Sequence, residues 1–193
     1  KLLWFPLIKY WIRQEQTGRS LNREQRRYVR KLKHQRYGYW IIAIDRTQWK
    51  GHNLFMVSLV WGTHAFPIYW EVLKKSGNSD LRTQKRLLGT VLPLLKNHPV
   101  LVLGDREFHS PKLASWLDAR GVSFALRQRK DFHFQEHLGE DYQVLKKLGF
   151  KPGMSKFYET ILGNKGDGLG PFNLAVYWKR KYRKAGPKEP WYI

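Results

Sequence analysis

Three short apolar stretches, separated by polar turns, mark the chain from Tyr39 onward. The run YWIIAID, residues 39–45, is rich in β-branched and aromatic residues and predicts a buried strand that ends in a carboxylate. The turn TQWKGHN leads to LFMVSLVW, and Gly62 marks a second turn before AFPIYWEVL. The pattern predicts a three-strand meander, with Pro67 placing the third strand at a sheet edge or a bulge.

Leucines at helical spacing follow the loop KKSGNSD. Ser79 or Asp80 can cap a helix that runs to about Leu95. VLVLGD, residues 100–105, again predicts a buried strand that ends in a carboxylate. The apolar pattern and the turn residues thus predict the first four strands and one helix.

The next elements complete an alternating order. Ser110 and Pro111 supply a cap and a first-turn proline for a helix that stops at Gly121, and SFALR follows as a fifth strand. Three strands, helix, strand, helix and strand predict an α/β fold with a mixed sheet and two right-handed crossovers. This is the order of ribonuclease H-like folds.

The flanking regions have a different pattern. Residues 21–34, LNREQRRYVRKLKH, predict a basic helix, whereas KFYETIL and FNLAVYW, separated by GNKGDGLGP, predict a small β-rich insertion. We therefore expect a basic helical segment over 1–38, a partial ribonuclease H-like core over 39–130 and a β-rich insertion region over 131–193. The first residue is not Met and PWYI resembles the start of a strand, so we expect a fragment of a longer protein.

The net charge of the chain indicates the kind of partner that it binds. The chain has 36 Lys and Arg against 15 Asp and Glu, a net charge of +21, which indicates a polyanionic partner, first of all nucleic acid. Without an apolar run of about 18 residues or a signal peptide, we expect a soluble intracellular protein with no membrane partner. The absence of Cys excludes disulfides and thiolate zinc sites. A non-catalytic, ribosome-like RNA binder fits this composition equally well.

Two carboxylates carry the candidate chemistry. Asp45 and Asp105 each end a predicted strand, and parallel pairing of the first and fourth strands would bring them together. Carboxylate oxygens are hard ligands that suit Mg²⁺ or Mn²⁺, and two such ions can support in-line displacement at a phosphodiester. Either Asp alone is more simply explained as the start of a turn; the pair, on so basic a chain, favours catalysis.

Four segments in this order, AIDRTQW, FPIYWEVLKKSGNSD, VLGDREFHS and FALRQRKD, resemble the insertion sequence four family of DDE transposases. The resemblance implies metal-dependent strand cleavage and strand transfer at insertion-sequence ends through an Asp, Asp, Glu triad. Asp45 and Asp105 match its first two members. The family's Tyr, Arg, Glu, Lys signature is absent before Ile193, and neither Glu159 nor Glu189 fits it. We therefore expect the chain to lack the third carboxylate and to be inactive alone.

The resemblance also implies partners: double-stranded DNA, as terminal inverted repeats and target DNA, a homodimer in a synaptic complex, and a place at the nucleoid of a prokaryotic cytoplasm. The candidate DNA-binding residues are Arg106, Arg127, Arg129, Lys179 and Arg180. The last two lie in YWKRKYRK, which interleaves aromatic and basic side chains. Solvated side chains, or a structural ion pair for Arg106, are the alternatives. At the level of function, a non-catalytic nucleic-acid-binding remnant and a ribonuclease H-like nuclease outside transposition stay open.

Two further observations concern metal ligands. Glu107 follows Asp105 closely and is a second choice as a ligand. His133 and His137 are four residues apart, as two zinc ligands on one helix face would be, but no third ligand accompanies them.

Overall fold

The computed structural model describes residues 38–61, 64–74, 77–163, 168–180 and 189–193. Apart from Gly38, the predicted basic helical segment over 1–38 lies outside these residues. The chain divides into two compact units, and each is made of two stretches of sequence. One holds the residues up to Leu103 together with Gly121–Phe124, and the other holds Gly104–Arg120 and Ala125–Ile193. Within the described residues the fold is mixed α/β, with two five-stranded sheets and few helices. The domain boundaries predicted from the sequence stay a prediction.

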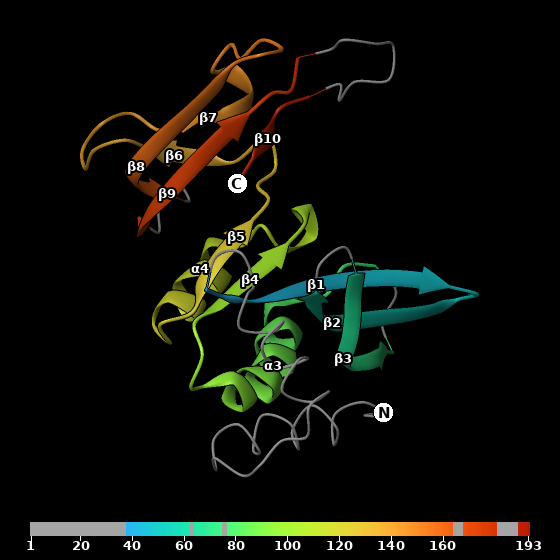
Figure 1. The fold of residues 1–193 in the computed structure, drawn as a ribbon. Helices are drawn as coiled ribbons and strands as arrows, with labels where there is room; N and C mark the ends of the chain where they lie inside the picture. Colours follow the sequence, from blue (N-terminus) through green and yellow to red (C-terminus); the bar gives the residue numbers. More distant parts are fainter. Residues whose placement is uncertain (1–37, 62–63, 75–76, 164–167, 181–188) are drawn as a thin grey trace. The chain divides into compact units, whose positions relative to one another are not determined.

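The first three strands follow one another as antiparallel neighbours (Figure 1). They are β1 (Trp40–Trp49), β2 (His52–Trp61) and β3 (His64–Leu73). Lys50 and Gly51, both with positive φ (45° and 79°), connect β1 to β2. A two-residue turn with this geometry matches the twist of a hairpin, so Trp49 pairs directly with His52.

One sequence prediction about β1 was wrong. The strand does not end at Asp45: it continues to Trp49, and Asp45 pairs with Met56 of β2. The apolar run ends at Ile44, but the length of an antiparallel hairpin is set by its turn, and the turn lies at Lys50 and Gly51. Asp45 therefore lies within a strand.

The prediction for Pro67 is confirmed. β3 is the edge strand of the first sheet, and its pairing with β2 shifts between Val57 and Ser58, next to Pro67. A proline has no N–H for the ladder, so an edge position with a bulge accommodates it.

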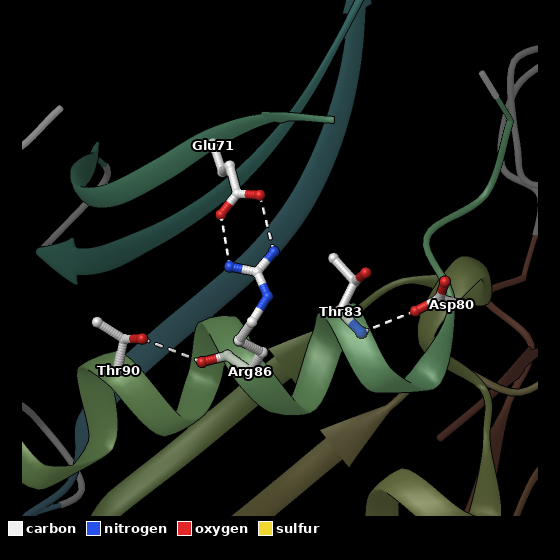
Figure 2. Close-up of polar contacts among 5 residues, drawn as sticks. All are labelled: Glu71, Asp80, Thr83, Arg86 and Thr90. Atoms are coloured by element: carbon white, nitrogen blue, oxygen red, sulfur yellow. Dashed lines mark hydrogen bonds and ion pairs between the residues drawn. The ribbon is translucent and has the colours of Figure 1, made fainter. Parts of the chain in front are cut away.

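Helix α3 (Leu81–Val91) is capped by Asp80, whose Oδ1 accepts a hydrogen bond of 2.7 Å from the backbone N–H of Thr83 (Figure 2). The helix ends earlier than predicted, because the segment with Pro93 forms a separate 3₁₀ turn, η1 (Leu92–Leu95). Arg86 of α3 forms a bidentate ion pair with Glu71 of β3, with both N···O distances at 2.7 Å (Figure 2). The pair ties the helix to the edge strand.

After α3 and η1, strands and helices alternate up to β5, as the sequence predicts. They are β4 (Val100–Gly104), the 3₁₀ turn η2 (Arg106–Phe108), α4 (Pro111–Asp118) and β5 (Ser123–Leu126). Ser110 occupies the N-cap position of α4, but its side chain makes no capping hydrogen bond. The strand order of the first sheet is β3-β2-β1-β4-β5, which makes β1 and β4 neighbours.

The second sheet is formed by residues of the region predicted to be β-rich, and its strand order is β10-β9-β8-β6-β7 (Figure 1). Its strands are β6 (His133–Gln135), β7 (Gln143–Val144), β8 (Ser155–Gly163), β9 (Leu169–Tyr177) and β10 (Trp191–Tyr192), and a 3₁₀ turn η3 (Leu145–Lys147) follows β7. The strands predicted around KFYETIL and FNLAVYW are confirmed. His133 lies in a strand, so it and His137 do not share a helix face.

Candidate functional site

Asp45 projects from the exposed side of β1. Its neighbour Ile44 is buried, and the alternation of a strand turns the next side chain to the opposite face. The carboxylate accepts hydrogen bonds from the backbone N–H of Arg46 at 2.8 Å and from the Thr47 hydroxyl at 3.4 Å. Each oxygen of Asp45 thus has a local donor, and each keeps lone pairs for a further ligand.

Asp105 is the first residue after β4 and the N-cap of η2. Its Oδ1 accepts a hydrogen bond of 2.9 Å from the backbone N–H of Glu107, so the side chain is oriented by the turn that follows it. The carboxylate is exposed to solvent. Glu107, the second choice as a ligand, donates this backbone N–H to Asp105.

The residue before Asp105 fixes where the turn begins. A Cβ added at Gly104 would lie 2.9 Å from the Cβ of Phe108 and 3.0 Å from Cδ2 of Leu126. Phe108 is fully buried. Only glycine therefore allows the end of β4 to approach Phe108 so closely.

Two arginines beside Asp105 share one carboxylate. Arg106 follows Asp105 directly, Arg127 follows β5, and each forms an ion pair with Glu189. The backbone N–H of Arg127 donates to the carbonyl of Gly104 at 2.8 Å. Sequence reasoning set Glu189 aside because it fits no motif, and no signal in the sequence connects it with two arginines so far away along the chain.

The side chain of Arg127 is the most enclosed of these groups. Its guanidinium lies 4.4 Å from the centre of the Trp191 ring, a cation–π contact. Burial lowers the pKa of Arg127, and the nearby Arg106 cation lowers it further, whereas Glu189 and Asp105 act in the opposite direction. The guanidinium is thus held between one ring and charges of both signs.

The other predicted DNA-binding residues lie elsewhere in the same unit. Arg129 forms a salt bridge of 2.9 Å with Asp131, and the hydrogen bond from Arg129 lowers the pKa of Asp131. Lys179 and Arg180 are exposed, and Nε of Arg180 lies 3.1 Å from where a Cβ on Gly153 would sit. Arg129 is thus partly neutralised, whereas Lys179 and Arg180 face solvent.

The two candidate aspartates lie on or next to neighbouring strands, β1 and β4. Among the residues that the structure describes, no group of three or more His, Asp or Glu side chains is arranged to hold a metal ion. Within the same residues, no helix is both long and apolar enough to cross a membrane.

Comparison with known proteins adds the family. The sequence matches the family described as the transposase DDE domain over residues 33–166, which is more than half of the chain. The chain belongs to the transposase DDE domain family. No curated protein matches the sequence.

Among solved structures, this member of the transposase DDE domain family is similar to one titled "Structure of Mos1 transposase catalytic domain and Raltegravir with Mg". The two sequences are 15% identical, the match covers 54% of this chain and 62% of that one, and the TM-score is 0.35. The chain thus spans less than two thirds of the length of that catalytic domain.

Proposed function

We propose that this chain carries the metal-binding core of a DDE-type DNA transposase of the insertion sequence four family, with a ribonuclease H-like arrangement of its first sheet. The observation that carries the proposal is the pair of exposed aspartates, Asp45 in β1 and Asp105 directly after β4, on neighbouring strands of a transposase DDE domain. The substrate is double-stranded DNA, as terminal inverted repeats and as target.

The donor chemistry of these residues suits Mg²⁺ or Mn²⁺. Both side chains are exposed carboxylates that accept hydrogen bonds from neutral backbone and hydroxyl donors, which leaves hard oxygen lone pairs for a cation. Asp45 and Asp105 would hold the ion. The bound ion would supply charge stabilisation at the phosphodiester and activation of the attacking oxygen. Two carboxylates are one short of the family's triad, and the described residues contain no cluster that completes it.

The proposed reaction has two steps. Water attacks a phosphodiester at the transposon end and releases a 3′-hydroxyl, which then attacks a phosphodiester of the target DNA. Basic side chains hold the DNA: Arg106 and Arg127 beside Asp105, with Arg129, Lys179 and Arg180 as further phosphate contacts. Joining two ends calls for a homodimer in a synaptic complex, in the prokaryotic cytoplasm at the nucleoid.

The test is cleavage of a plasmid that carries the DNA flanking the gene of this chain, assayed with the full protein and Mg²⁺. Asp45→Asn and Asp105→Asn should each reduce the cleavage rate by at least about 100-fold. A metal ion contributes several kcal/mol to transition-state stabilisation, and each 1.36 kcal/mol corresponds to about a factor of ten in rate.

The control is Asp141→Asn, which removes the same charge from an exposed loop residue and should leave the rate within about twofold. Mn²⁺ binding, followed by paramagnetic relaxation of water protons, gives a second readout that should weaken in the two test variants. Full cleavage by both Asp45→Asn and Asp105→Asn would overturn the assignment. Binding of DNA with no metal-dependent cleavage by the full protein would indicate the non-catalytic remnant instead.

A further inference from the structure

One carboxylate oxygen forms ion pairs with two arginines near Asp105. Oε1 of Glu189 forms an ion pair with Nη2 of Arg106 and lies 3.7 Å from Nη2 of Arg127. The side chains of Arg106, Arg127 and Glu189 are 46%, 21% and 37% exposed, so the cluster is open to solvent on one side. The three side chains carry two positive charges and one negative charge, and Asp105 is a second anion that acts on Arg127.

Two other arginine–carboxylate pairs among the described residues are built differently. Arg86 and Glu71 use two nitrogens and two oxygens, with both distances at 2.7 Å, and Arg129 engages both oxygens of Asp131, at 3.1 and 2.9 Å. In those pairs one carboxylate matches one guanidinium. Glu189 is shared between two, so donors of Arg106 and Arg127 remain for another acceptor.

Arg127 is the fixed member of the cluster. It is held from one side by the Trp191 ring and through its backbone by Gly104, and it is partly removed from water. A partly desolvated cation needs a nearby anion, and Glu189 provides one. Since exposed ion pairs contribute little stability, a ligand with more acceptor oxygens can replace this carboxylate at low cost.

A phosphodiester meets that requirement. Its two non-bridging oxygens carry one negative charge and match the fork of a guanidinium, and two arginines can bind one phosphate together. We propose that Arg106 and Arg127 form a single phosphate-binding site and that Glu189 is its internal competitor, displaced when a DNA phosphate binds. The proposal rests on the proposed function in one respect, namely that the ligand is DNA.

The experiment measures the Kd of the full chain for a fluorescent 30-base-pair duplex of random sequence by anisotropy, in EDTA, over a range of salt concentrations. Glu189→Gln should tighten binding by about threefold to tenfold, because the arginines lose their internal anion. It should also steepen the salt dependence by about one phosphate contact. Glu159→Gln, which removes the same charge from an exposed position of β8, is the matched control and should change Kd by less than about twofold.

Variants of the two arginines test whether the effect of Glu189→Gln on DNA affinity depends on Arg106 and Arg127. In an Arg106→Gln background, and separately in an Arg127→Gln background, Glu189→Gln should give no more tightening than Glu159→Gln. The first background guards against a folding defect, because Arg106 is the more exposed of the two. Thermal unfolding of each variant checks that the fold is retained.

Equal effects of Glu189→Gln and Glu159→Gln, or a gain from Glu189→Gln that persists in both arginine backgrounds, would overturn the proposal. Neither metal nor cleavage enters this assay. Loss of the competitor effect with intact Asp-dependent cleavage would therefore refute this inference alone. Tightening by Glu189→Gln without any cleavage by the full protein would refute the proposed function and leave the phosphate site standing.

Discussion

The two five-stranded sheets differ in how their faces are covered. In β1, β2 and β4 of the first sheet, the residues that point to one face are buried, and those between them are mostly partly covered, with Asp45 exposed. The buried positions include Ile42, Val57 and Val102, and the partly covered positions between them include Ile41, Met56 and Leu101. Of the two candidate aspartates, Asp45 lies within β1 and Asp105 comes directly after the end of β4.

In the second sheet only one face is buried. Tyr158, Val176 and Tyr192 point into its core. The opposite face exposes Phe157, Tyr177 and Trp191, and the last two are directly paired across β9 and β10. The comparison teaches that the first sheet presents its candidate carboxylates singly, one within a strand and one after a strand end, whereas a sheet covered on one face can present a whole row of side chains to a ligand.

The largest effect should come from the covered face of the second sheet. Phe134 is fully buried in its core, so Phe134→Ala should lower the free energy of unfolding by about 3–5 kcal/mol. Phe157, on the other face, is 57% exposed, and Phe157→Ala should cost no more than about 0.5 kcal/mol. Urea unfolding of the two variants measures the difference, and similar losses would mean that the exposed face is covered in solution.

A smaller change in the free energy of unfolding should follow when a glycine in each sheet is replaced by alanine, which adds one methyl group. At Gly104 of β4, a Cβ meets the Cβ of Phe108, which is close to the backbone and has little room to move. At Gly163 of β8, it meets the far end of the Phe132 ring, at 2.7 Å, which can turn away. Gly104→Ala should therefore destabilise the protein by about 1–3 kcal/mol and Gly163→Ala by less, as measured by urea unfolding.

The same substitution should affect cleavage, since Gly104 positions the turn that carries Asp105. We expect Gly104→Ala to reduce the cleavage rate more than its loss of stability explains, when both variants are assayed well below their unfolding temperature. A Gly163→Ala variant that lost as much activity would contradict this ordering.

Much of this fold could be predicted from the sequence, for a physical reason. Strands covered on both faces need continuous apolar runs, and VLVLG gave β4 with its following Asp105 correctly. The end of β1 was placed wrongly, because a hairpin strand extends as far as its turn and its polar residues can pair just as well. The pattern of apolar residues predicts which part of a strand is buried, whereas the length of the strand depends on its pairing with the neighbouring strand.

The candidate site was less predictable than the strands. The neighbouring position of β1 and β4 follows from element order, but the sharing of Glu189 by Arg106 and Arg127 does not. That contact depends on how Glu189 and the two arginines are arranged in three dimensions, which side-chain identity alone does not specify. Long-range ion pairs of this kind are properties of the folded chain and leave no pattern in the sequence.

The smallest effect should come from the bidentate pair on the first sheet. The hydrogen bond from Arg86 lowers the pKa of Glu71 below its ordinary value of 4.5. A carboxyl group whose pKa is lower in the folded state stabilises the fold above its unfolded pKa, and this contribution is lost as pH falls through the folded value. Both side chains are partly exposed, so solvent screening limits the contribution to about 1 kcal/mol or less.

Glu71→Gln should therefore lower the free energy of unfolding slightly at pH 7 and flatten its dependence on pH below about 4.5, as followed by urea unfolding across this range. Arg86→Gln should do the same, whereas Arg82→Gln, an exposed change of equal charge on the same helix, should leave the pH dependence intact. Glu189→Gln provides the contrast, since it should alter DNA affinity. If Glu71→Gln tightened DNA binding as much as Glu189→Gln, the closed pair and the shared carboxylate would not differ in kind, and the gain would reflect net charge alone.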